Sequence, residues 1–590
     1  MYLRTVKAKG GKGEIYEYIR LVEAYWEDGR SKQRVVSNLG RKDLLAPHLD
    51  ALVRLLQGEE ASQSNKGDVQ YDQAASWGPA LVARSLWRQL GLEDIIDRLE
   101  PRSRRLKGER LTLSDRVLAL VTHRLCCPGS EHALASFLET DYVCDRSGKR
   151  LHPKWKQHGR VQVDLSWLQR WYRSLDELLE FKDDIEGELF ARLRDLFSLE
   201  TELVFYDLTS TYFEGHGPCG LARHGYSRDG KPRKRQVLLG VVMINGWPIA
   251  HHVFRGNKRD SETVIEVLKD IDQRLGLKRV IFVGDRGMVT TDNLEVIKTR
   301  KHGYLMGLQR RRRKRIYELV QRVKESEWIE LPGGITASEK FDSPKSWVQE
   351  VTLEGETIRS FVVHSEEREQ YERTMREKSM QRTREGLEKL SNRVKKGRIK
   401  QPEKIGQAAA RVLTKNHGHR YYDWKLNKGV FEYFEHPVYL ERERAYEGKY
   451  LIQTEEKDFT AVEAVTTYKE LSEVERGFRE LKDILRMRPI YHRKEDRVRA
   501  HVFVAALAFL LDRALEKKLK AARVPLSSAQ ALKSLKTIHV VEITLDGRCK
   551  RGVTGGSKRA QQVLVAADIS AEDQQLPLSQ ESKSGLGAAS

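Results

Sequence analysis

Cysteines and long apolar runs are scarce in this sequence, and acidic residues are fewer than basic ones. The five cysteines are scattered along 590 residues and none belongs to a CxxC pair, which excludes a disulfide framework and a zinc site built on paired cysteines. The longest apolar run, Val502 to Leu511, is about half a membrane span. The first residues, "MYLRTVKAKGGKGEIYEYIRL", lack the apolar stretch of a signal peptide. We therefore expect a cytoplasmic protein without a membrane segment.

Because basic residues outnumber acidic ones, the chain has a strong positive charge. Lys+Arg 106 against Asp+Glu 85 give a net charge of +21. Such an excess favours phosphate-rich partners, because bound basic side chains release the counterions that surround a nucleic acid. Nucleic acid is therefore the leading candidate partner. A basic protein without such a partner is the alternative that composition leaves open.

The residue pattern changes along the chain, and the length exceeds that of a single domain. Two β-rich segments flank Asp28 and Gly29, a favoured hairpin turn pair. Helical spacing begins at Trp77, and Thr112 and Asp115 are spaced as a capping box. The expected domains are an N-terminal β-hairpin region (1–60), a linker (61–70), a helical domain that is a candidate for recognising DNA ends (71–200), the first part of an α/β core (201–310), an insertion (311–447), the second part of the core with its last helix (448–515), a C-terminal region (516–574) and a disordered tail (575–590).

From Thr201 the sequence consists of short apolar segments typical of strands. "ELVFYDLTSTYF", "QVLLGVVMI" and "WPIAHHVF" precede a helical segment, "SETVIEVLKDIDQRLG", and then "KRVIFVGDRG" and "GYLMGLQ" follow. This order predicts a mixed α/β sheet. A charged segment with its own strand-like stretch, "SWVQEVTLEGETIRSFVVHS", and a long charged helix interrupts the sheet, and "KYLIQTEE" resumes it.

The segment "TTYKELSEVERGFRELKDIL", from Thr466 to Leu485, is predicted to be one amphipathic helix. Its apolar residues share one stripe, and an adjacent stripe carries Tyr468, Glu475 and Lys482, with Arg479 near the same line. The apolar stripe consists of Leu471, Val474, Phe478, Leu481 and Leu485. An ordinary surface helix with a Glu475–Arg479 pair is the simpler interpretation.

Two aspartates weigh against that simpler interpretation. Asp207 closes the apolar run "LVFYD" and Asp285 closes "VIFVGD". A strand-end aspartate can simply cap a turn, yet ligand sites of open α/β sheets form at the carboxyl ends of strands, and neighbouring carboxylates repel unless cations neutralise them. A third carboxylate from a packed helix would complete an all-oxygen site for two Mg²⁺ or Mn²⁺ ions, which suits in-line phosphodiester displacement.

These residues together resemble a known family. Tyr468, Glu475 and Lys482 have the spacing of the Tyr-x2-Arg-x3-Glu-x6-Lys signature of DDE transposases from bacterial insertion sequences. "VFYDLTSTYFEG" and "VGDRGM" resemble the first and second aspartate motifs of that group, and the similarity extends from about Leu203 to Phe509. The resemblance implies a ribonuclease-H-like mixed sheet with a large insertion before the last catalytic helix.

The resemblance also implies roles for individual residues. Asp207, Asp285 and Glu475 correspond to the metal ligands, and Tyr468 and Lys482 to contacts with transposon-end DNA. The signature arginine is replaced by Leu471, so its DNA contact is either absent or supplied by a neighbour such as Lys469 or Arg476.

Several other residues have competing interpretations. Consecutive cations could neutralise DNA phosphates or form a solvated turn; they are Arg310, Arg311, Arg312 and Arg313. Trp328 and Trp347 could stack on an unpaired base or belong to the core. Turn or surface positions are expected for Asp229, Glu214 and Asp260, and solvent-facing positions for Glu473 and Glu480. His216, Cys219 and His224 do not have zinc spacing.

The sequence thus predicts a nucleoid-associated transposase that cleaves and joins double-stranded DNA by metal-assisted transesterification. Two transposon ends must be held together, so a homodimer or larger assembly on DNA is expected. No nucleotide-binding motif is present and no nucleotide cofactor is expected. The alternatives are a metal-dependent nuclease with the same triad and a DNA-binding derivative without catalysis.

Overall fold

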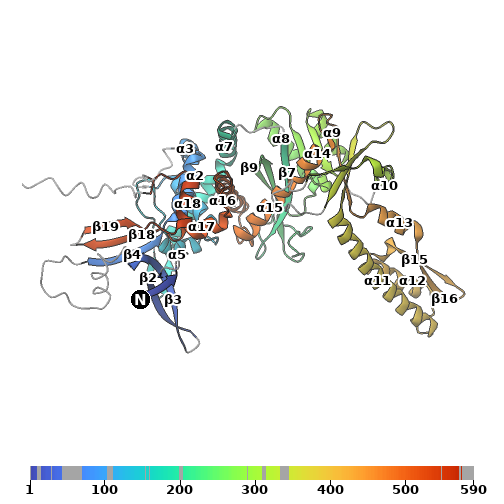
Figure 1. Cartoon of the computed structure of the whole chain (residues 1–590), viewed down its shortest axis with the longest axis horizontal. Coiled ribbons are helices and arrows are strands. Elements are labelled where there is room, and N and C mark those ends of the chain that lie inside the picture. Colours follow the sequence, from blue (N-terminus) through green and yellow to red (C-terminus); the bar gives the residue numbers. More distant parts are fainter. Residues whose placement is uncertain are drawn as a thin grey trace, which may run out of the picture. The chain divides into compact units, whose positions relative to one another are not determined.

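The chain folds into two compact units in a computed structural model (Figure 1). Unit 1 comprises Met1–Arg192, Leu481–Met487 and Lys494–Ser590, and unit 2 comprises Leu193–Glu480 and Arg488–Arg493. The structure describes residues 2–9, 15–27, 30–42, 69–101, 111–152, 155–158, 160–197, 203–288, 290–308, 314–332, 345–545, 548–570 and 573–574. The linker predicted at 61–70 lies almost entirely outside these residues, as do the tail at 575–590 and Arg310 to Arg313.

Unit 1 begins with a three-stranded antiparallel sheet. The strands are β1 (Tyr2–Lys9), β2 (Ile15–Glu27) and β3 (Arg30–Arg41), in the order β1-β2-β3. The predicted pairing of the two strands that flank Asp28 and Gly29 is confirmed, because Glu27 pairs with Arg30. β1 was not predicted from the sequence. It pairs antiparallel with β2, with Tyr2 opposite Val22 and Lys9 opposite Ile15.

Helices form the body of unit 1. They are α2 (Gly78–Gln89), α3 (Leu92–Leu99), α4 (Leu113–Cys126), α5 (Ala133–Thr140), α6 (Leu165–Glu180), most of α7 (Lys182–Phe197), α16 (Glu495–Ala521), α17 (Ser528–Leu535) and α18 (Lys558–Ala566). The apolar run from Val502 to Leu511 lies in α16, which packs against α4 and α6. A helix that is apolar on nearly all sides must be buried, and this run forms the centre of the unit. No helix in the described ranges is long and apolar enough to cross a membrane.

A second small sheet in unit 1 combines one strand that precedes the first helices with two strands from the C-terminal region. β4 (Val69–Ser76) pairs with β18 (His539–Leu545), which pairs with β19 (Arg548–Val553). A third pair, β5 (Trp155–His158) and β6 (Arg160–Val163), is a short hairpin. The C-terminal region at 516–574 therefore folds together with residues of the predicted helical domain.

Unit 2 is built on a nine-stranded mixed sheet with the order β12-β13-β14-β17-β11-β10-β7-β8-β9. Its strands are β7 (Leu203–Tyr212), β8 (Gln236–Ile244), β9 (Trp247–Arg255), β10 (Ile281–Gly284), β11 (Gly303–Gly307), β12 (Ile329–Glu330), β13 (Ser346–Val351), β14 (Arg359–Ser365) and β17 (Lys449–Thr454). β7, β8 and β9 are antiparallel neighbours, whereas β10 and β11 run parallel to β7. The predicted mixed α/β sheet is confirmed.

The helices of unit 2 cover this sheet or extend from it. They are α8 (Asp260–Gln273), α9 (Thr291–Thr299), α10 (Lys314–Gln321), α11 (Glu366–Lys395), α12 (Pro402–Lys415), α13 (Pro437–Tyr446), α14 (Ala461–Lys469) and α15 (Leu471–Arg479). Tyr206 on β7 donates a hydrogen bond to Thr263 on α8 at 3.0 Å, which ties that helix to one face of the sheet. β15 (Tyr422–Asn427) and β16 (Val430–Glu435) form a separate hairpin.

The predicted insertion has two different parts. Its first strands, β12 to β14, extend the large sheet through β17. Its later helices and the β15–β16 hairpin leave the sheet after β14 and return to it at β17 (Figure 1). The insertion therefore adds β12, β13 and β14 to the edge of the sheet beyond β17.

Candidate active site

The two predicted aspartates lie side by side where β10 ends. β10 runs parallel to β7 with Gly284 opposite Tyr206, so Asp285 and Asp207 directly follow a paired position on neighbouring strands. The prediction that Asp207 ends its strand is wrong, because β7 continues to Tyr212 and Asp207 pairs with Val241 of β8. Asp207 instead lies where the parallel neighbour stops, and it is partly buried there.

The surroundings of Asp207 disfavour its charged form. Burial raises the pKa of Asp207 to about 7, with smaller contributions from the nearby carboxylates of Asp285 and Glu475. The Leu208 backbone N–H, which donates to Asp207 Oδ1 at 2.7 Å, and the Arg228 guanidinium act in the opposite direction. The charges of both other members of the predicted triad therefore act on the Asp207 carboxylate.

Glu475 comes to this place on α15, which packs against β7. The predicted apolar stripe is confirmed, since Leu471, Val474, Phe478, Leu481 and Leu485 are all buried. Glu475 itself is exposed. The helix thus buries one side against the sheet and presents Glu475 at its margin.

The prediction of one continuous helix from Thr466 to Leu485 is wrong. A turn at Glu470 separates α14 from α15, and a π-helical segment occupies Glu480–Ile484. A π-helix has more residues per turn than an α-helix, so the seven-residue spacing no longer returns to the same side. Lys482 lies in this segment, is buried at 9% exposure, and clusters with unit 1. The expected stripe of Tyr468, Glu475 and Lys482 is therefore not continuous.

The remaining residues of the signature are on α14 and α15. Tyr468 is partly buried, with its hydroxyl 2.3 Å from the place where a Cβ on Gly307 would lie and its ring 6.3 Å from that of Tyr450. The absence of a side chain at Gly307 therefore makes room for Tyr468 at the end of β11. Arg479 is exposed on α15, and Leu471 is buried as predicted.

The three carboxylates converge but do not meet at one point. All three are described, and their ligand oxygens do not all lie within 4.8 Å of one another. Like charges repel, which favours such separation in the free protein. Glu475 is exposed, whereas Asp207 and Asp285 are partly buried.

An arginine near this site was not foreseen. The Arg228 guanidinium donates to both carboxylate oxygens of Asp260, at 2.7 and 2.8 Å. The Arg228 backbone N–H donates to Ser210 Oγ at 3.0 Å. Asp260, expected at the surface, is the first residue of α8 and holds the guanidinium whose charge acts on Asp207. Within "GYSRDGKP" only a turn could be recognised, because both partners come from elsewhere in the chain.

Other carboxylates depart in part from their predicted environments. Asp229 does lie in a turn, but its side chain is only 3% exposed and lies 2.5 Å from Arg488. The prediction that Glu473 and Glu480 face solvent is wrong, because both are partly buried and lie 2.9 and 3.6 Å from Arg476. Arg476 is therefore already engaged in two ion pairs. Glu214 is exposed as expected and lies 2.6 Å from Lys234.

The predicted aromatic and thiol residues have simple environments. Trp328 and Trp347 are partly buried, and both contact the ring of His364, with ring centroids 5.8 and 5.6 Å away. Among the described residues, His216, Cys219 and His224 belong to no group of three or more side chains that could hold a metal ion.

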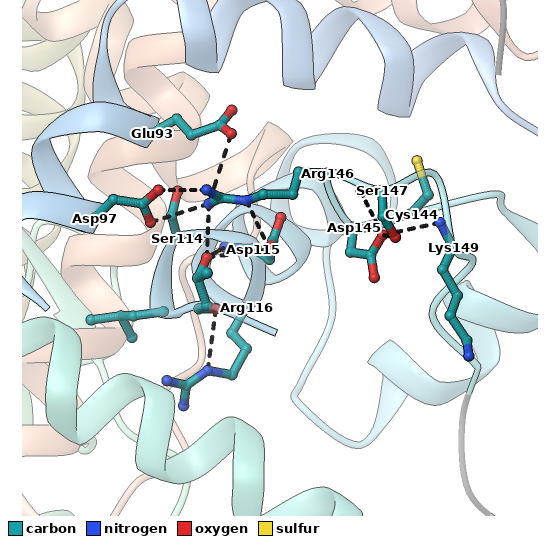
Figure 2. A network of polar contacts seen from close by, with 12 residues as sticks. Glu93, Asp97, Ser114, Asp115, Arg116, Cys144, Asp145, Arg146, Ser147 and Lys149 are labelled. Atoms are coloured by element: carbon teal, nitrogen blue, oxygen red, sulfur yellow. Dashed lines mark hydrogen bonds and ion pairs between the residues drawn. The ribbon is translucent and has the colours of Figure 1, made fainter. Parts of the chain in front are cut away.

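Unit 1 holds a polar network of a different kind (Figure 2). Arg146 lies 2.6 Å from Asp97, 3.7 Å from Glu93 and 3.4 Å from Asp115. Thr112 caps α4, as predicted, by accepting from the Asp115 backbone N–H at 3.2 Å. Arg146 also lines a cavity of about 580 Å³ between α2 and the loop after α5. In this network the Arg146 guanidinium lies within 3.7 Å of three carboxylates, those of Glu93, Asp97 and Asp115, and offsets part of their charge.

Two family models match this chain. A family model described as Transposase DDE domain matches residues 200–511, which is more than half of the 590 residues. A second, described as IS1634 family transposase, N-terminal domain, matches residues 3–68. Among curated proteins no match was found. The chain therefore belongs to the DDE transposases of bacterial insertion sequences.

Proposed function

We propose that this transposase binds the ends of its element and performs both strand cleavage and strand transfer, with Asp207, Asp285 and Glu475 as its catalytic carboxylates. The observation that carries the proposal is that Asp207 on β7, Asp285 directly after β10 and Glu475 on α15 lie near one another. Burial, and then the charges of Asp285 and Glu475, raise the pKa of Asp207. The order of β9, β8, β7, β10 and β11 supports a ribonuclease-H-like core.

The residues suit one or two Mg²⁺ or Mn²⁺ ions. Carboxylate oxygens are the ligands that these hard cations prefer, and a cation would offset both the burial of Asp207 and the repulsion from Asp285 and Glu475. When bound, such ions activate an attacking hydroxyl or water and stabilise the leaving oxygen of an in-line phosphodiester displacement.

The chain itself contributes position and charge balance. β7 and β10 fix the backbones of Asp207 and Asp285 at the same level, so both point from a rigid sheet. Arg228, held by Asp260, supplies the protein's own positive charge beside them. First a water would attack one phosphodiester and leave a free 3′-OH. That hydroxyl would then attack a second phosphodiester, and no covalent bond to the protein is needed.

Contacts with DNA complete the proposal. Tyr468 on α14 and Arg479 on α15 are proposed to contact the transposon end, together with Lys482 and the basic segment Arg310 to Arg313. Because joining two ends requires that both be held at once, we propose a homodimer or a larger assembly on double-stranded DNA in the cytoplasm, without a nucleotide cofactor.

The test is a comparison of the wild type with Glu475→Gln on labelled DNA from the borders of the element, in the presence of Mg²⁺. The proposal expects a discrete nick with a 3′-OH and a joined product from the wild type only, with binding retained in the variant. Cleavage without joining would identify a metal-dependent nuclease. Binding without cleavage by both proteins would identify a non-catalytic derivative, and equal cleavage by both would exclude Glu475.

A further inference from the structure

The later part of the insertion forms an arm that extends from the large sheet (Figure 1). The chain leaves the sheet after β14 and returns at β17, and these two points adjoin, since the Ser365 backbone N–H donates to Gly448 O at 3.0 Å. Between them, α11 has 30 residues and is therefore about 45 Å long. The arm thus places its far end well away from the sheet on a continuous helix.

The arm has a hydrophobic core of its own. Buried side chains from α11, α12 and the β15–β16 hairpin form one cluster that includes Leu387, Ile405 and Phe431. Arg384 lies 2.8 Å from Glu435, and further along α11 the Ser391 hydroxyl donates to Phe431 O at 3.3 Å. β16 therefore runs back along α11, which places the hairpin turn at 428–429 beside the C-terminal end of α11.

Three chain segments with an excess of basic residues meet at this far end, which we name the arm tip. They are the last turn of α11, the connection with the first turn of α12, and the β15–β16 turn. Residues 393–404 include six Lys or Arg and a single acidic residue, Glu403. The basic residues of the arm tip are Arg393, Lys395, Lys396, Arg398, Lys400, Lys404 and Lys428, all of them exposed. Within the described part of the chain, none of the seven forms an ion pair.

Helix termini account for only part of this charge. Arg393 and Lys395 lie in the last turn of α11, where cations are favourable beside the negative end of the helix dipole. Lys396, Arg398 and Lys400 follow that helix, and the N-cap of α12, Gln401, makes no side-chain cap. The start of α12 therefore has no side-chain cap among these cations, and the positive end of its helix dipole adds to the attraction for an anion.

We propose that the arm tip binds the phosphate backbone of double-stranded DNA, at a distance from the site that contains Asp207. The proposal rests on the function proposed above only in taking DNA as the partner. Exposed cations from three segments without acidic partners match a row of phosphates, whereas the backbone contacts carry no sequence information. The length of α11 would let the tip reach DNA more than one helical turn from the DNA beside the catalytic carboxylates.

The test replaces four tip residues at once in the full-length protein: Lys396→Gln, Arg398→Gln, Lys400→Gln and Lys404→Gln. The matched control removes the same charge from exposed residues elsewhere on the arm: Lys378→Gln, Arg382→Gln, Lys389→Gln and Lys415→Gln. Binding to a labelled duplex of unrelated sequence is measured over a range of salt concentrations. Thermal unfolding checks that both variants remain folded.

The tip variant is expected to bind at least about tenfold more weakly than the control at physiological salt, with its salt dependence reduced by about 0.9 per lost phosphate contact. Equal weakening in both variants would show that only net charge matters and would overturn the proposal, as would tighter binding to duplex RNA than to DNA. If the wild type binds no duplex at all, the proposed function fails as well. If it binds and cleaves but the tip variant keeps the wild-type salt dependence, the tip proposal alone fails.

Discussion

Both units gather carboxylates, but they surround them with different partners. In unit 1, Asp115 lies 3.4 Å from Arg146 and 3.7 Å from Arg84, and these guanidinium groups oppose the upward shift that burial gives its pKa (Figure 2). In unit 2, the nearby charges of Asp285 and Glu475 add to the effect of burial on the pKa of Asp207, which the Leu208 backbone N–H and the Arg228 guanidinium oppose.

We propose that this difference separates a structural cluster from a functional one. Acidic groups that the protein neutralises with its own arginines need no further partner, and their loss should affect stability. Acidic groups whose mutual repulsion adds to the effect of burial cost folding free energy, and perturbed carboxylates of this kind are typical of catalytic sites. The predictions below test whether the two clusters separate in this way.

The largest effect is expected from Asp207→Asn. The amide keeps the shape of the side chain but removes a charged ligand oxygen, so cleavage should fall by more than about a hundredfold while DNA binding remains. The measurement is the rate of 3′-OH formation on labelled border DNA, with a filter or gel assay for binding. Loss of both activities together would indicate that Asp207 supports the fold rather than the chemistry.

The opposite pattern is expected when a cation is removed from unit 1. Arg116 is 6% exposed, 3.4 Å from Glu100, which is 3% exposed, and 2.8 Å from Glu177. Arg116→Met leaves the Glu100 carboxylate buried without this partner, which should destabilise unit 1 by about 3–5 kcal/mol. Denaturant unfolding followed by circular dichroism measures this loss. An unchanged unfolding midpoint would contradict the view that this pair stabilises the unit.

A smaller effect is expected from pH. Because the pKa of Asp207 is raised in the folded protein, the folded state binds a proton that the unfolded state has already released, and stability falls as pH rises between the two pKa values. With divalent ions chelated, unit 2 should lose about 2 kcal/mol from this group between about pH 5 and pH 7.

Asp207→Asn is the control for that experiment, because it removes the titrating group. The wild type should lose more stability than the variant over this interval, and parallel curves would show that Asp207 does not titrate abnormally. Added Mg²⁺ should restore stability to the wild type at the higher pH and have less effect on the variant, since a bound cation favours the ionised carboxylates.

The sequence predicted the central strands well because they are buried on both faces. β8 is buried at every position, so it appears as an uninterrupted apolar run that needs no knowledge of its neighbours. The buried stripe of α15 was predictable for a similar reason, since a helix packed on a sheet repeats its apolar residues every three or four positions.

What could not be predicted depends on contacts between distant segments. The burial of Asp229 is set by Arg488, and the extent of β7 by its pairing with β8. The π-helical segment at Glu480–Ile484 has no recognised residue pattern, and it alone removes Lys482 from the stripe that a regular helix would form. The arm tip, in contrast, was visible only as a charged segment until folding placed the β15–β16 turn beside it.

The smallest effect is expected from Glu473→Gln, which sharpens the comparison within a single helix. Glu473 lies on α15 two residues before Glu475, is about one-third exposed, and lies 2.9 Å from Arg476. A partly exposed pair of this kind contributes about 0.5 kcal/mol or less, so stability should hardly change and cleavage should remain at the wild-type rate. Glu475→Gln makes the same chemical change on the same helix and should abolish cleavage. If the two variants lose cleavage equally, then the charge of α15 as a whole, rather than the position of Glu475 beside Asp207, would determine activity.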